Sequence, residues 1–454
     1  MSIQVSPSAI PNSNTVSLTS ILDKDTYLTE LLNQVTAPKT EGWLQELREG
    51  ATSWVRHSTI PTTREEEWRF TDLSSLRKVQ FNNVEMRKFA SLQFDILPEA
   101  ATSRLVFVNG VFAPELSAVL DLPSGIVVSN LAGLSVVEQQ AVQQYLAQAE
   151  GAQEVFTALN TSGITDAAVV WVKKNVVVET PIHLVFISVV GETATISQPR
   201  CLVVAESGSQ VTLVEEYTNR EDAKEEVYLT NAVTEVWVGD NAEVSHTRIE
   251  QEGAEAFHIG KTAIAQSRDS RYTCHAITLG AKLSRHNLEI LQTGEQTQTT
   301  LNGLTIISGK QLADTHSVIA LNYPHGTSDQ LHKCIVGDRA HAVFNGKVFV
   351  PKPAQLTNAA QLNRNLLLSS KARVDTKPQL EITADNVKCA HGATVSQLED
   401  DEIFYLQSRG IDENDARKLL INAFAAEVIN EIPVPSLREI LLNTVNNLKS
   451  LTNE

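Results

Sequence analysis

The sequence predicts a mainly β protein: a right-handed parallel β-helix core flanked by N-terminal and C-terminal α-helical regions. Short β-branched runs alternate with polar turns between about Arg104 and Val395. Helical periodicity is nearly absent from roughly 220 residues beginning near Ala168. This stretch is too long for an ordinary β-sandwich. The imperfect recurrence of turn and strand indicates stacked coils, in which each coil buries its inner face against the next. A pair of jelly rolls or a large barrel is the structural alternative that strand counting leaves open.

Residues 1–100 are expected to form an N-terminal helical region, and residues 101–395 the β-helix core. In the first region apolar residues recur at three and four positions, as at Leu18, Ile21 and Leu22 and again between Trp43 and Val55. The switch to β-branched runs follows near Arg104. The 454 residues are too many for one compact core, so several structural units are expected.

Residues 396–454 are expected to form a C-terminal helical domain of three helices. Ser396, Asp412 and Ser436 are the predicted residues at the three helix starts, because each precedes an amphipathic stretch. Three short helices cannot hide all of their apolar faces among themselves. Packing against the β core explains most of these faces, and a surface for a partner protein is the second interpretation.

Composition excludes several classes of function. The formal net charge of -17 and the lack of a basic run argue against binding of nucleic acid. No run of eighteen or more apolar residues occurs, so no membrane span is expected. The four cysteines are widely spaced and form no C-x-x-C pair, which is typical of a reducing compartment, and we expect a cytoplasmic protein.

The most informative motif is the pair Cys389 and His391. They lie two positions apart within a strand-like alternation, so an extended backbone places thiol and imidazole on one face. Both groups are ligands of iron and zinc, but two ligands do not complete a tetrahedral site. The remaining ligands would have to come from elsewhere in the chain, from another subunit or from a cluster's own sulfides. A buried thiol beside a hydrogen-bonded histidine is the alternative.

A second group of potential metal ligands lies between residues 314 and 341. It comprises His316, His325, His332, Cys334 and His341, with Asp314, Asp329 and Asp338 interspersed. Their spacings match no closed-site signature, and within stacked coils they can face several directions. We therefore expect hydrogen-bonded histidines here, with a metal-storage protein as the alternative.

Motifs for independent catalysis are lacking. The chain has no H-E-x-x-H, no G-x-S-x-G and no phosphate-binding loop of the required spacing, so it is not expected to hydrolyse ATP. A self-sufficient β-helix enzyme acting on carbohydrate would need paired carboxylates and aromatic platforms in a groove. Aromatic residues make up only 6% of this chain, which disfavours that alternative.

Several segments resemble the SufB/SufD family of iron–sulfur cluster assembly proteins. They are Glu66-Glu67-Trp68-Arg69-Phe70-Thr71, Pro324-His325-x-x-Ser328-x-Gln330, Val343-Phe344-Asn345-Gly346-Lys347-Val348, Gln361-x-Asn363-Arg364-Asn365-Leu366, Lys388-Cys389-x-His391-Gly392 and Phe404-Tyr405-Leu406-x-Ser408-Arg409-Gly410. The segment around Cys389 is similar to the SufD branch. SufB proteins carry further cysteines that are absent here.

This resemblance implies a noncatalytic scaffold that pairs with SufB along the β core and docks the SufC ATPase on its C-terminal helices. It implies that a transient iron–sulfur cluster forms at the SufB interface, where His391, with Cys389 as a second candidate, contributes to metal binding. No cofactor is expected to be held tightly by the isolated chain, for which a homodimer is an alternative to pairing with SufB. The candidate SufC-docking residues are Phe404, Leu419, Leu420, Phe424 and Val428.

Overall fold

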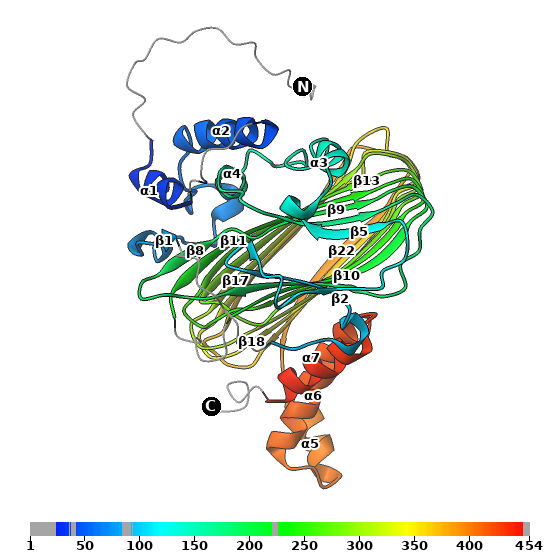
Figure 1. Cartoon of the computed structure of the whole chain (residues 1–454). Helices are drawn as coiled ribbons and strands as arrows, with labels where there is room; N and C mark the ends of the chain where they lie inside the picture. The colour runs from blue at the N-terminus through cyan, green and yellow to red at the C-terminus, as the bar shows by residue number, and fades with distance from the viewer. Residues whose placement is uncertain are drawn as a thin grey trace.

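The computed structural model describes residues 24–35, 37, 42–83, 92, 94–219 and 226–447. Leu18, Ile21 and Leu22, where the helical spacing was expected to begin, lie outside these residues. Two large sheets face each other, with one helical group at one side and a second group projecting from the opposite side (Figure 1).

From β9 onward consecutive strands alternate between the two sheets, and nearly all neighbours are parallel. Sheet A runs β5 (Ile126–Asn130), β6 (Ala168–Val172), β9 (Arg200–Ala205), β11 (Tyr228–Val238), β13 (Phe257–Gln266), β15 (Leu283–Gln292), β17 (Leu312–Ala320), β19 (His341–Val350) and β21 (Arg373–Ile382), with β1 (Asn82–Asn83) and β8 (Thr195–Ser197) beside it. Sheet B runs β3 (Val111–Phe112), β2 (Ser103–Val108), β7 (Ile182–Ser188), β10 (Gln210–Asn219), β12 (Glu243–Gln251), β14 (Arg271–Thr278), β16 (Gln298–Ile307), β18 (Thr327–Val336), β20 (Asn358–Leu367) and β22 (Lys388–Gln397), with β4 (Ala118–Val119) paired to β2. A strand in one sheet followed by a strand in the other makes one coil, which confirms the predicted parallel β-helix, of about seven turns.

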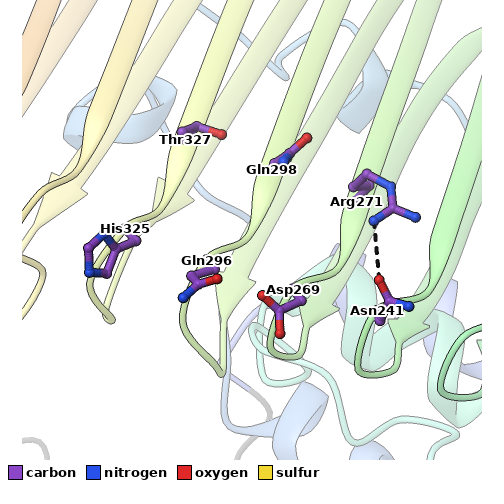
Figure 2. Close-up of a pocket in the computed structure, with 7 residues that line it drawn as sticks. All are labelled: Asn241, Asp269, Arg271, Gln296, Gln298, His325 and Thr327. Carbon is purple, nitrogen blue, oxygen red and sulfur yellow. Dashed lines mark hydrogen bonds between the residues drawn. The ribbon is translucent and has the colours of Figure 1, made fainter.

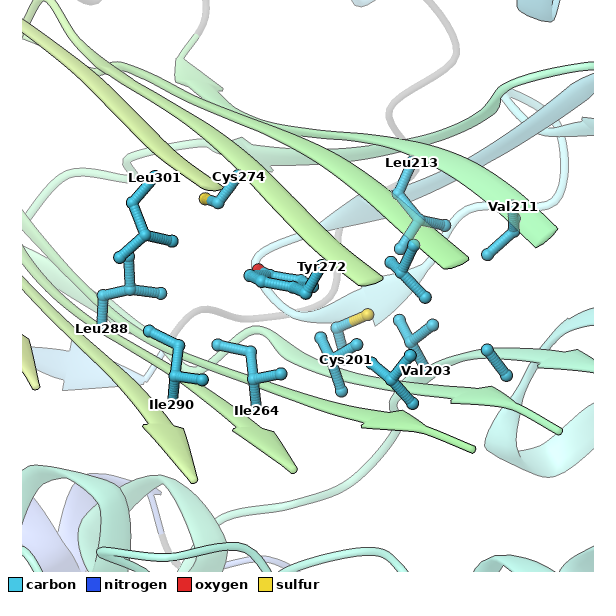
Figure 3. Close-up of a cluster of buried hydrophobic side chains, with 14 of the residues drawn as sticks. Cys201, Val203, Val211, Leu213, Ile264, Tyr272, Cys274, Leu288, Ile290 and Leu301 are labelled. Atoms are coloured by element: carbon cyan, nitrogen blue, oxygen red, sulfur yellow. The ribbon is translucent and has the colours of Figure 1, made fainter. Parts of the chain in front are cut away.

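The space between the sheets is filled by inward-facing side chains from both of them. Figure 3 shows Val203 and Ile264 of sheet A facing Leu213 and Cys274 of sheet B. Each of these four residues is at most 2% exposed. Every second residue of a strand points inward, so the β-branched alternation of the sequence is sufficient to form this layer.

Seven α-helices and four short 3-10 helices occur in the part of the chain that is described. The helices are α1 (Thr26–Val35), α2 (Trp43–Arg56), α3 (Val136–Val142), α4 (Val155–Ser162), α5 (Asp400–Ser408), α6 (Glu413–Ile429) and α7 (Pro435–Asn447), and the 3-10 turns are η1 (Glu66–Trp68), η2 (Leu76–Lys78), η3 (Pro98–Ala100) and η4 (Leu131–Gly133). The helices α1, α2 and α4 lie near the outer face of sheet A, where Leu28, Val55 and Phe156 join a cluster with Phe257. The outer face of sheet B is covered by α6 and α7, where Ile421 and Leu437 join a buried cluster with Ile277.

The two ends of the β-helix differ. At the N-terminal end β5 pairs antiparallel with β6, and β3 and β4 pair antiparallel with β2, so the first coils are closed by strands of another direction. At the C-terminal end β21 pairs only with β19, and β22 only with β20, among the described residues. We call the outer edges of β21 and β22 the free edge.

Some local predictions were wrong. Ser396 does not cap a helix, because β22 continues to Gln397 and α5 begins at Asp400 with Glu399 before it. The core region also contains the helices α3 and α4, which the sequence did not indicate. Asp412 is confirmed as the cap of α6, since its carboxylate accepts hydrogen bonds from the amides of Asn414 and Asp415.

Candidate functional site

Cys389 and His391 lie together on β22, at the free edge. Strand geometry turns both side chains to the inner side of sheet B, as the alternation predicted, where their register partners on β20 are Ala359 and Gln361. Cys389 is half-buried and packs against the core between the sheets, whereas His391 is exposed. Burial raises the pKa of the Cys389 thiol above its usual value, so a metal would have to displace a proton to bind it.

The inner side of the last coils is polar next to His391. Gln361 donates to Gln330 over 2.8 Å, and Gln330 donates to Ser317 over 2.8 Å. A side chain at Gly346 on the facing sheet would collide with the Gln361 amide, so the glycine makes room for it. The hydrogen-bonded side chains of Gln361, Gln330 and Ser317 thus hold β20 in place beside His391.

A thiol and an imidazole at an uncovered strand edge can supply two ligands from one side. Among the described residues no group of three or more His, Cys, Asp or Glu side chains is arranged to hold a metal ion. The pair is therefore suited to a site that a second protein completes, and the free edge offers backbone groups for that protein to pair with.

The second group of potential ligands is dispersed over the molecule. His316 lies on the outer face of sheet A, 3.0 Å from Asp314 and 3.3 Å from Glu67, and these carboxylates raise its pKa despite its burial. His332 is buried between the sheets, where its ring stacks on Phe344. The expectation of hydrogen-bonded histidines is confirmed for both residues.

His325 occupies a third place, at the turn before β18. Figure 2 shows it in a row with Gln296, Asp269 and Asn241, each from a successive coil. All four have positive φ, so the same tight turn is stacked from coil to coil. The residues line a polar hollow of about 570 Å³ that also includes Arg271, Gln298 and Thr327. His325 is thus not near His316 or His332.

A buried polar network in the middle coils was not predicted from the sequence. His246 lies 2.9 Å from Glu215, and His258 lies 2.8 Å from Glu252, with Arg248 against the second imidazole. Burial raises the pKa of Glu252 to about 8. Burial opposes ionisation of Glu215 too, but hydrogen bonding to His246 and its charge lower that pKa to about 2. The alternation that marks these positions as inward-facing could have identified them as buried and therefore paired.

The candidate docking residues of the C-terminal helices fall into two groups. Phe404 is 70% exposed and Leu419 is 49% exposed, and the neighbouring Tyr405, which was not predicted, is 57% exposed. Leu420 and Phe424 are half-buried. Val428 is fully buried against sheet B, so it positions α6 and is not part of the exposed surface. None of the described helices is both long and apolar enough for a membrane crossing.

Comparison with known proteins agrees with this architecture. Residues 187–424 match the family model described as SUF system FeS cluster assembly, SufBD core domain, and residues 26–184 match the SufBD protein N-terminal region. The first of these covers the strands from β8 onward, all of α5 and most of α6.

Three curated relatives match this chain over most of their own length. An iron–sulfur cluster assembly SufBD family protein of Synechocystis sp. is 50% identical over 93% of this chain and 95% of its own. The iron–sulfur cluster assembly protein SufD of Escherichia coli is 33% identical over 84% of this chain and 88% of its own, and that of Bacillus subtilis is 26% identical over 89% and 93%. The chain therefore belongs to the SufB/SufD family of SUF iron–sulfur cluster assembly proteins, and its relatives include proteins named SufD.

Proposed function

We propose that this chain is the SufD-type scaffold subunit of a SUF assembly complex. It pairs with SufB through the free edge and docks the SufC ATPase on α5 and α6, so that ATP is hydrolysed by the partner and not by this chain. The iron–sulfur cluster is the cargo of the complex and is held only transiently. We also propose that the protein acts in the cytoplasm, on the basis of its widely spaced cysteines.

The observation that carries this proposal is the placement of Cys389 and His391 on an unpaired parallel strand. An edge strand presents backbone donors and acceptors for another strand, and the inner face of β22 carries both potential ligands. The imidazole of His391 is exposed and needs no rearrangement to reach a metal that SufB also binds. The same edge would serve a homodimer when the chain is isolated.

The C-terminal helices supply the second half of the proposal. Only two residues separate the end of β22 at Gln397 from the start of α5 at Asp400, so movement of the helices acts directly on the strand that bears the ligands. Dimerisation of SufC would draw the helices of SufB and this chain together and open the interface to iron and sulfide. Phe404, Tyr405 and Leu419 form the exposed apolar surface for docking.

The decisive variant is His391→Ala. Because His391 is exposed, the variant should fold and bind both partners, while the SufB–SufC complex that contains it should lose cluster formation, measured by absorbance and by iron and sulfide content. His325→Ala, at an exposed turn residue, is the matched control and should retain the wild-type yield. An unchanged cluster yield for His391→Ala would refute the role given to the imidazole.

Metal analysis of the isolated chain separates this proposal from the alternatives. A scaffold should retain little tightly held metal without SufB, whereas a metal-storage protein should retain a stoichiometric amount. A carbohydrate-acting enzyme should release reducing sugar from polysaccharide without any partner. Either of the latter two outcomes would replace the scaffold assignment.

A further inference from the structure

Four side chains join the C-terminal helices to the outer face of sheet B. Lys333 of β18 and Arg364 of β20 meet Phe424 and Glu427 of α6. We call these four residues the clasp. They link segments that are more than sixty residues apart in the sequence, with Arg364 and Glu427 separated by 63 positions.

Lys333 is the buried member of the clasp. Its side chain is only 1% exposed, and its ammonium group donates to the backbone carbonyl of Phe424 over 2.8 Å and forms an ion pair with Glu427. The ammonium also lies 4.1 Å from the centre of the Phe424 ring. Burial lowers the pKa of Lys333, although Glu427 opposes this effect. These three contacts tie the buried cation to one turn of α6, and loss of a partner would leave a buried charge uncompensated.

Arg364 is the second cation of the clasp, and it comes from the neighbouring strand β20. It donates to the Glu427 carboxylate over 3.0 Å, and its guanidinium lies 5.6 Å from the Phe424 ring. The ring is therefore contacted by cations from two neighbouring strands, and one carboxylate bridges both. Lys333 and Arg364 are register partners, so the clasp spans the junction of β18 and β20.

Residues beside the clasp hold β22. Asn365, which follows Arg364, points inward and donates to the backbone carbonyl of Thr394 over 2.9 Å. Ser396 in turn donates to the backbone carbonyl of Asn365 over 3.3 Å. The contacts thus continue from α6 through β20 to the strand that carries Cys389 and His391.

The clasp also lies where α6 leaves the body of the protein. The residues of α6 that follow it, such as Val428 and Ile429, are fully buried, whereas Leu419 in the preceding half is 49% exposed. The first half of α6 and α5 therefore project from the body, as Figure 1 shows. A force applied to the projecting part is resisted at the clasp.

We propose that the clasp is the positioning element that couples α5 and α6 to β22 and so controls access to the half-buried thiol of Cys389, beside the exposed His391. This inference deepens the proposed function, on which its biological meaning rests. The four side chains act through β20 and β22 and are not metal ligands themselves. Weakening the clasp should loosen β22 selectively while the inner coils stay closed.

The chain contains its own reporter for this test. Cys201, Cys274 and Cys334 are each 1% exposed, and Cys389 is half-buried. Maleimide labelling of the isolated full-length chain should therefore report on Cys389, with Cys389→Ser as the blank. Glu427→Gln removes both ion pairs at a residue whose side chain is 48% exposed, so the variant should fold. We expect roughly a threefold or greater increase in the labelling rate of Cys389, with faster amide exchange in β22 than in wild type.

A matched control breaks an ion pair on the other sheet. Lys347 and Glu381 form an ion pair of 2.7 Å on the outer face of sheet A. The pair lies in the same last coils, but neither residue is part of the clasp. Glu381→Gln should leave labelling of Cys389 at the wild-type rate. An unchanged rate in Glu427→Gln, or an equal acceleration of all four thiols, would overturn the coupling role. Lys333→Met, Glu427→Gln and the variant with both substitutions form a double-mutant cycle. Additive effects of the two substitutions on the labelling rate of Cys389 would also contradict the clasp.

A second arm uses the assembled complex. Addition of ATP to wild type with SufB and SufC should change the labelling rate of Cys389, and Glu427→Gln should retain SufC binding and ATP hydrolysis but lose most of that change. A full ATP response in Glu427→Gln would overturn the proposal. Failure of the wild-type chain to bind SufB and SufC would count against the proposed function, whereas the isolated-chain result would still decide the coupling between α6 and β22.

Discussion

The two ends of the β-helix are built from the same repeat but are finished differently. The first coils are closed by the antiparallel strands β3, β4 and β5, and inward residues there such as Ile182 are fully buried. The last coils end at the free edge, where the inward residues of β21 and β22 are half-buried or exposed. Parallel strands usually have both edges and both faces covered in a finished domain. The contrast teaches that the first end is closed by its own strands, whereas the second leaves strand edges unpaired among the described residues, as the proposed pairing with another chain requires.

The largest expected effect tests this contrast with one substitution made at each end. Ile182→Ala in β7 should lower the free energy of unfolding by about 3 to 4 kcal/mol, because it leaves a cavity in a closed core. Ile382→Ala in β21 should cost about 1 to 2 kcal/mol, because that side chain is already half-exposed to water. Urea unfolding of the two variants gives both values. Equal costs would show that the last coils are as closed as the first.

A second prediction concerns the buried imidazole of His332. Burial lowers its pKa to about 4, below the value near 6.5 expected for the unfolded chain. The unfolded state therefore binds a proton that the folded state does not as the pH falls from about 6.5 to 4. His332 should cost a few kcal/mol of stability over that interval and nothing above it. His332→Gln should flatten this part of the stability curve, measured by urea unfolding at several pH values, and an unaltered slope would contradict it.

The smallest expected effect on stability belongs to Ala393→Pro at the free edge. The amide of Lys388 donates to the carbonyl of Thr357, the residue just before β20, so alternation turns the amide of Ala393 away from β20. Proline there should cost about 1 kcal/mol or less, yet it removes a donor from the free edge. We expect the melting temperature to change by only a few degrees and the pairing with SufB, measured by co-purification, to weaken strongly. Intact pairing would show that the partner does not use the backbone of β22.

The fold could be predicted because its main signal is local. Alternation within each strand and the turns between strands were visible in single segments, and the same alternation placed Cys389 and His391 on one face. The helix start at Ser396 was mispredicted because a serine three residues before a glutamate is also compatible with the end of a strand. Val428 was assigned to a docking surface because helical spacing identifies an apolar face but not what covers it.

The rest of the site depends on which coils lie next to each other. Gln361 lies beside His391 only through the register of β20 and β22, across 30 residues of sequence (391 − 361) whose turns set that register. The space for His332 depends on Gly303 in the preceding coil, where a side chain would collide with the imidazole. The clasp likewise joins a strand to a helix that forms after the last coil. Such pairings are properties of the stack and not of any one segment.

The uncovered last coil has a consequence for the supply of this protein in a cell. If the free edge pairs with SufB as proposed, a newly made chain exposes a template for strand addition until that partner binds, and two copies can pair through their free edges in the meantime. Synthesis in step with the partner would limit this self-association, so a surplus of one subunit should be harmful in proportion to its excess.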